Sequence, residues 1–160
     1  MDGKLNGGYF VFNPGTPLEE RIKNTLTADG AEMILQAAFQ ADDNFAAALY
    51  MGLSNASYTY ESASVASIAA EEPSGNGYAR AALTRNATDW TVSLINGIMR
   101  VQSKLCTFTA SGNWSKNWSR AFIIDQTATK VIAASGAAPS ERVVLTGQGP
   151  TVQYEFWLPG

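Results

Sequence analysis

Residues 90–103 read Trp-Thr-Val-Ser-Leu-Ile-Asn-Gly-Ile-Met-Arg-Val-Gln-Ser, two alternating segments on either side of Asn96-Gly97. Asn-Gly between two such segments is typical of a type I′ turn, because both residues tolerate a positive φ angle. A two-residue turn also fixes the register, so Val92 should pair with Val101. We predict an antiparallel hairpin with one polar face and one apolar face. The apolar face, which we expect to be buried in a core, contains Trp90, Val92, Leu94, Met99 and Val101.

Similar short segments fill most of the remaining chain and predict a mainly β protein. From about residue 44 to residue 160, β-branched and aromatic residues alternate with turn residues at short intervals, which is typical of an antiparallel β-sandwich or jelly roll in one domain. The last segment directs Val152, Tyr154, Phe156 and Leu158 to one face and Trp157 to the other. The predicted strands are 46–53, 77–84, 90–95, 98–103, 105–110, 119–125, 129–134, 141–146 and 151–158, with a short helix at 63–70.

Residues 1–17 differ from this pattern and predict an extended N-terminal arm. They are rich in Gly, Asn and Pro around the aromatic run Tyr9-Phe-Val-Phe12, and such a run needs a partner surface to bury against. Tyr9, Phe10 and Phe12 are therefore candidate interface residues. An alternative stays open, because the same run has high β propensity and could be the first strand of the domain's own sheet.

A helical segment is predicted over residues 18–43. Thr16 and Glu19 have the spacing of a capping box, in which each side chain bonds to the other residue's backbone N–H. Apolar residues then recur at the spacing of one helix face. They are Leu18, Ile22 and Leu26.

The composition excludes most catalytic chemistry. The 160 residues contain no histidine and a single cysteine, Cys106. Without histidine the chain has no Ser-His-Asp or Cys-His site and no His-ligated metal. One cysteine cannot form an internal disulfide or a multi-cysteine zinc site. We therefore expect no enzyme activity, no cofactor and no metal. A two-carboxylate glycosidase and a Ser-Lys nucleophile are the enzymatic alternatives that remain.

Charge and hydropathy limit the partners. A net charge of −3 argues against nucleic acid, since no basic surface is available to displace counterions. No apolar run approaches the roughly 18 residues of a membrane span, and the N-terminus lacks the apolar segment of a signal peptide, so we expect synthesis in the cytoplasm. Only 16% of residues are charged, which is low for a free monomer and indicates a surface that contacts other protein.

Three tryptophans are candidates for contact with partners. The tripeptide Asn-Trp-Ser occurs at 113–115 and again at 117–119, which places Trp114 and Trp118 on the same side of the chain. They could fill one end of the core, or they could form a contact patch for protein or sugar. Trp157, on the outward face of the last predicted strand, is the stronger interface candidate.

Several short segments carry a resemblance to a group of viral proteins. In order, they are Ala48-Leu-Tyr-Met-Gly-Leu53, Ser67-Ile-Ala-Ala-Glu-Glu-Pro73, Gly75-Asn-Gly-Tyr-Ala-Arg80, Cys106-Thr-Phe-Thr109 with Trp114, and Ala121-Phe-Ile-Ile-Asp125. From about residue 46 onwards the chain resembles small β-sandwich or jelly-roll virion proteins of tailed bacteriophages. The N-terminal part of the chain lies outside this resemblance.

The resemblance implies a non-enzymatic structural role. Such proteins are similar in function to capsid decoration (cement) proteins, which bind the major capsid protein and stabilise the head as homo-oligomers, with a trimer favoured. The location implied is the capsid surface of a virion, after synthesis in the cytoplasm of the host bacterium. The alternatives are a tail, collar or fibre component, and a carbohydrate-binding β-module that uses exposed tryptophans.

Overall fold

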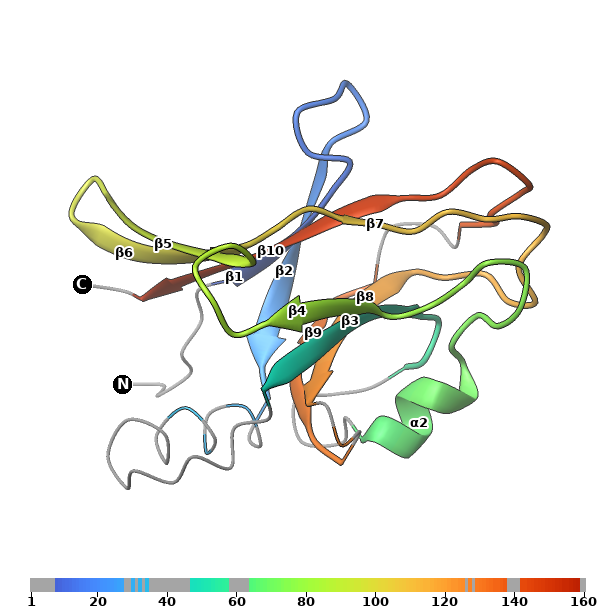
Figure 1. Cartoon of the computed structure of the whole chain (residues 1–160), viewed down its shortest axis with the longest axis horizontal. Helices are drawn as coiled ribbons and strands as arrows, with labels where there is room; N and C mark the ends of the chain where they lie inside the picture. The colour runs from blue at the N-terminus through green and yellow to red at the C-terminus, as the bar shows by residue number, and fades with distance from the viewer. Residues whose placement is uncertain are drawn as a thin grey trace.

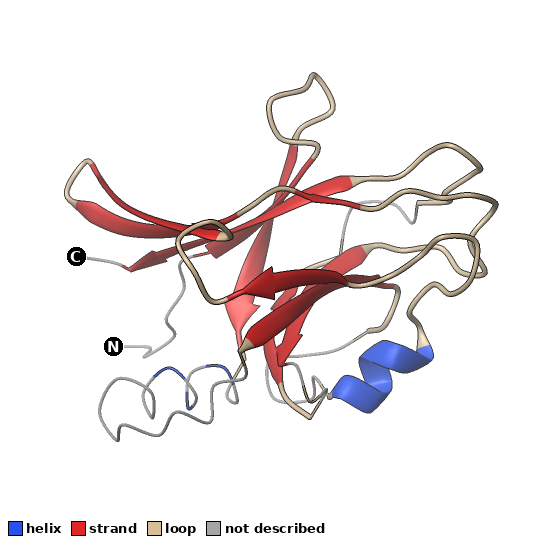
Figure 2. Ribbon diagram, in the orientation of Figure 1, coloured by secondary structure: helices blue, strands red, loops and turns tan. Residues whose placement is uncertain are grey.

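The computed structural model describes residues 8–27, 30, 32, 34, 47–57, 64–125, 127, 129–137 and 142–158. Strands dominate these residues, and the helix α2 (Val65–Ala70) lies beside them (Figure 2). The strands are β1 (Gly8–Phe12), β2 (Glu20–Leu26), β3 (Ala48–Ser54), β4 (Ala81–Thr84), β5 (Trp90–Ile95), β6 (Ile98–Ser103), β7 (Cys106–Thr107), β8 (Arg120–Asp125), β9 (Val131–Ser135) and β10 (Thr151–Leu158).

The strands form one hydrogen-bonded path that folds into two layers. Their order is β4-β3-β8-β9-β2-β1-β10-β6-β5, with β7 paired to β10. The first layer holds β5, β6, β10 and β1, and the second layer holds β4, β3, β8 and β9. Strand β2 joins the two layers (Figure 1). The prediction of a mainly β, antiparallel sandwich is confirmed.

The core lies between the layers. Its fully buried members come from both of them, so each layer supplies the surface that covers the other. On the far side of the second layer, α2 places Ile68 against β8 and β9. The largest buried side chains include Phe10, Phe12, Met51, Leu53, Leu83, Trp118 and Ile123.

The predicted arm is wrong for residues 8–12, and the alternative left open for this run is correct. These residues form β1, which pairs with β10 on one side and with β2 on the other. Phe10 lies opposite Tyr154 and Ile22, and both Phe10 and Phe12 are completely buried. They are core residues, so neither is available to a partner. Residues 1–7 lie outside the described part of the chain.

The predicted helix is wrong for residues 20–26, which form β2. A spacing of four residues fits one face of a helix, but four is also a multiple of the strand repeat of two. Ile22 therefore packs in the core from a strand, whereas Leu18 is 76% exposed in the β1–β2 loop. The capping-box residues stabilise that loop instead, since Thr16 accepts from Leu18 N–H and Glu19 accepts from Gly15 N–H. The second half of this prediction falls mostly outside the described residues.

Other predicted strands are shorter than expected. The segment 77–84 is a strand only from Ala81, and 105–110 is one only at Cys106–Thr107. In place of a strand at 141–146, the described residues contain a single bridge between Arg142 and Trp118. The helix expected at 63–70 is present as α2, where Ser64 and Ser67 form a reciprocal capping box.

Candidate interaction surface

The β5–β6 hairpin has the geometry that its sequence predicts. Asn96 and Gly97 have φ angles of 52° and 79°, as a type I′ turn requires. Val92 pairs with Val101, and every other pair follows the same register. The predicted register is therefore confirmed.

The burial predicted for this hairpin is wrong. On the apolar face, Val92 is 62% exposed, Leu94 is 67% exposed and Met99 is 39% exposed. Trp90 and Val101, nearer the body, are only partly covered. The cause is the unequal length of the layers, because the hairpin projects beyond the ends of β3 and β4 (Figure 1). The inner face of one layer thus continues where the other layer no longer covers it.

A cavity connects this exposed face to the core. Its volume is about 460 Å³, and its walls come from both layers. Trp90 and Val101 of the hairpin line it together with Tyr154 and Phe156 of β10. The second layer contributes Leu49, Ile123 and Ile132. An apolar surface therefore runs from the open end of the sandwich along the hairpin to its tip. We name the exposed part of this surface, Val92, Leu94 and Met99, the hairpin face.

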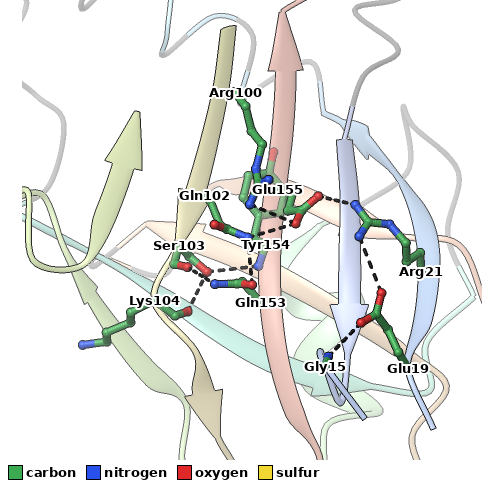
Figure 3. Close-up of polar contacts among 10 residues, drawn as sticks. All are labelled: Gly15, Glu19, Arg21, Arg100, Gln102, Ser103, Lys104, Gln153, Tyr154 and Glu155. Atoms are coloured by element: carbon green, nitrogen blue, oxygen red, sulfur yellow. Dashed lines mark hydrogen bonds and ion pairs between the residues drawn. The ribbon is translucent and has the colours of Figure 1, made fainter. Parts of the chain in front are cut away.

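The opposite face of the same layer is polar and is organised around one buried carboxylate. Glu155 projects outward from β10 but is only 3% exposed, because charged and amide groups surround it (Figure 3). Arg21 of β2 donates to its Oε2, the Arg100 guanidinium lies 3.3 Å from its Oε1, and Gln102 donates to Oε1 at 2.9 Å. The network joins three strands, so it stabilises the layer.

The two interface candidates on this outer face contact the same arginines. The Arg21 guanidinium lies 5.4 Å from the ring centroid of Tyr9, and that of Arg100 lies 5.4 Å from the ring centroid of Trp157. Tyr9 is 36% exposed and Trp157 is partly buried. Each ring covers one flank of the ionic network. Both aromatic side chains therefore already have a cation–π contact within this chain.

Removing the central carboxylate tests this network. Glu155→Gln keeps the shape but leaves Arg21 and Arg100 without their shared counter-charge, so we expect the free energy of unfolding to fall by about 1–3 kcal/mol. Glu71→Gln is the matched control, since Glu71 pairs with Lys116 at 3.3 Å on the surface. Exposed pairs contribute at most about 1 kcal/mol. Urea denaturation of both variants measures the difference, and equal losses would show that the network does not stabilise the layer.

The structure places Trp114 and Trp118 in the core. Trp114 is 7% exposed and meets the Tyr78 ring edge-on at a centroid distance of 5.1 Å. Trp118 is 1% exposed and stacks on Phe12 at 5.1 Å. The hypothesis of a contact patch for protein or sugar is therefore wrong for this pair, and the core alternative is correct. Inward-facing aromatic side chains from separate segments meet here because β1 lies inside the sheet.

The pKa shifts of Cys106 and Tyr78 follow from their burial in the fold and from a neighbouring carboxylate. Burial raises the pKa of the Cys106 thiol to about 11, which disfavours a reactive thiolate. Burial and the neighbouring Glu72 raise the pKa of the Tyr78 phenol, which donates to that carboxylate. Within the described ranges, no three Asp, Glu or Cys side chains gather as metal ligands would. No helix among the described residues has the length and apolar character needed to span a membrane.

Two aspartates have lowered pKa values because of their hydrogen bonds. Burial alone would raise the pKa of the Asp125 carboxyl, but donors from Thr127, Thr129 and Lys130 outweigh it. The backbone N–H groups of the last two lie 2.8 Å and 2.7 Å from Asp125 Oδ1. Lys104 Nζ, at 2.9 Å from Asp89 Oδ2, lowers the pKa of that carboxyl, and the Thr84 N–H adds to the effect.

These shifts predict how stability depends on pH. Below the unfolded-state pKa of about 3.9, the unfolded chain binds protons that the folded carboxylates do not. The free energy of unfolding therefore decreases as the pH is lowered through that range. Above it the contribution is complete. Since the chain has no histidine, we expect a nearly constant melting temperature between about pH 5.5 and 7.5. Asp125→Asn should melt lower than the unmodified chain at pH 7 and lose less stability on acidification. A melting temperature that changes steeply near pH 6.5 would contradict this account.

Comparisons with family models, curated proteins and solved structures give no match. The structure itself establishes the class of this chain, a mainly β antiparallel sandwich. Its candidate site is the hairpin face. The alternating sequence pattern identifies the residues of this face but predicts that they lie in the core. The sequence of the hairpin shows that one of its faces is apolar and the other polar. It does not show whether the second layer extends far enough to cover the apolar face.

Proposed function

We propose that this chain is a non-enzymatic bacteriophage virion structural protein, a capsid decoration protein that stabilises the head as a homo-oligomer. The observation that supports the proposal is the hairpin face, an apolar surface on two paired strands that the chain's own second layer leaves uncovered. The resemblance of the body to small virion proteins supplies the class of assembly. The trimer favoured by sequence analysis stays a prediction.

The hairpin face has the properties of a docking surface. Val92, Leu94 and Met99 lie on two paired strands, so little conformational entropy is lost when they are covered. Full burial of a large apolar side chain contributes about 1.5–3 kcal/mol. The adjoining cavity can receive a side chain from a partner, and an apolar patch continuous with a cavity is a typical site of protein contact.

The structure changes how attachment must be explained. Phe10 and Phe12, expected in a docking arm, are core residues, so the hairpin face replaces them as the proposed contact with the major capsid protein. Trp114 and Trp118 are buried too. This leaves the sugar-binding alternative without the exposed aromatic platform on which it was based.

Add-back to undecorated capsids tests this function. Purified protein is mixed with capsids of its phage assembled without it, and the bound copies are counted by quantitative gel densitometry. We expect saturation at a fixed number of copies per capsid and a higher temperature of capsid disruption. Binding that never saturates, or no binding at all, would contradict a decoration role. Binding to purified tails but not to heads would identify a tail component instead.

A further inference from the structure

Strand β5 is an unprotected sheet edge. Among the described strands it pairs only with β6 and ends the sheet order. Its sequence, Trp-Thr-Val-Ser-Leu-Ile, contains no charged residue and no proline, and its ladder shows no register shift. Natural edge strands usually carry at least one such device against pairing with another chain. The opposite edge, β4, is shorter and is flanked by Arg80 and Arg85.

Among the described residues of β5, two have both their N–H and their C=O group free at the open edge. Because the type I′ turn makes Ile95 and Ile98 a hydrogen-bonded pair, Ser93 also bonds to β6, while Val92 and Leu94 direct their N–H and C=O groups to the open edge. Trp90 would be the next in this row, but its N–H donates to the Asn86 carbonyl oxygen at 3.0 Å. No backbone hydrogen bond from Val92 or Leu94 to a described residue beyond this edge is present.

We propose that a second copy of this chain pairs antiparallel along β5. The occupied Trp90 N–H selects the register, because pairing Val92 with its own copy would require Trp90 to pair as well. Setting Val92 opposite Leu94 of the second copy uses only free groups and brings the two Ser93 residues face to face. An uncharged strand meets its own copy without electrostatic repulsion, unlike an edge that carries lysine or arginine.

The pairing determines the oligomer and leaves the hairpin face available. Contact of one edge with its own copy is isologous and closes at two chains, so the basic unit is a dimer and not the trimer favoured by sequence analysis. Directly opposed residues of an antiparallel pair project to the same side. The hairpin faces of both copies therefore form one continuous apolar surface. This inference rests on the proposed self-association. In it, the edge of β5 binds the second copy and the hairpin face binds the capsid.

Cysteine cross-linking tests the register without any capsid. In the proposed dimer, Ser93→Cys places two thiols on directly opposed residues whose Cα atoms lie about 4.5–5.5 Å apart, within disulfide reach. Thr91→Cys, on the same face of the same strand, is the matched control, because its two copies are about 13 Å apart. Cys106 is 2% exposed and should not react in either variant. Under mild oxidation we expect a covalent dimer of Ser93→Cys on a non-reducing gel and almost none of Thr91→Cys. Equal cross-linking of both variants, or none of either, would overturn the proposal.

A proline variant tests the backbone pairing separately. Val92→Pro removes the N–H that faces the open edge and leaves the ladder to β6 intact, a position where edge strands tolerate proline. Val92→Thr is the control, because it keeps the N–H. Light scattering should show a monomer for Val92→Pro and a dimer for Val92→Thr. A dimer of unchanged mass for Val92→Pro would overturn the edge pairing. The capsid-binding assay would still judge the decoration function independently.

Discussion

Removal of residues 1–13 is expected to yield a chain that does not fold. The deletion eliminates β1, which supplies the hydrogen bonds on both of its edges, to β2 and to β10. It also removes Phe10 and Phe12, both fully buried. Losing either phenylalanine alone typically costs about 3–5 kcal/mol, and a domain's whole stability is about 5–15 kcal/mol. Circular dichroism and thermal melting of the truncated protein measure the outcome.

Point variants on the same strand provide the control. Phe12→Ala should lower the free energy of unfolding by about 3–5 kcal/mol because it empties a site against Trp118. Tyr9→Ala, on the outer face of the same strand, should cost only about 0.5–1 kcal/mol, the range for an exposed cation–π contact. A truncated protein that melts cooperatively near the temperature of the full chain would show that β1 is dispensable and would restore the hypothesis of a docking arm.

The double variant Val92→Thr/Leu94→Thr is expected to lose capsid binding without losing the fold. Both side chains are more than 60% exposed, so their replacement removes little of the core. If both are buried in the complex, the lost apolar contact amounts to about 3–4 kcal/mol, or a 100-fold to 1000-fold weaker affinity. Sedimentation of the variant with undecorated capsids measures this loss.

A second double variant controls for apolar area as such. Val143 and Leu145 are 61% and 47% exposed outside the hairpin, so Val143→Thr/Leu145→Thr removes the same side-chain types elsewhere on the surface. It should bind capsids as the unmodified protein does. Equal loss of binding in both double variants would indicate a nonspecific hydrophobic effect, and unimpaired binding of the hairpin variant would exclude the hairpin face as the contact.

The fold was predictable wherever local chemistry determined it. The Asn96-Gly97 turn fixed the hairpin register, and the alternation of the last strand placed Tyr154 and Phe156 in the core. Residues 20–26 were not predictable in the same way, because their fourfold spacing fits a strand as well as a helix. Tyr9–Phe12 was ambiguous because its partners, β2 and β10, include a strand more than 130 residues away in sequence. Such long-range pairing overrides local composition.

The candidate site was harder to predict than the fold. The apolar side of the hairpin is evident in the sequence, but its exposure depends on where β3 and β4 end in the other layer. Glu155 shows the reverse case, since an outward-facing residue became buried when Arg21 and Arg100 closed over it. Whether a strand face is covered is a property of the assembled layers, and alternation alone does not contain it.

The most direct test of the central claim is a cryo-EM reconstruction of the phage virion in which we propose that this chain is a component. We predict a fixed number of copies on the capsid surface, each with Val92, Leu94 and Met99 buried against the major capsid protein. Finding the chain absent from the particle, or finding these three side chains open to solvent in every copy, would contradict the account.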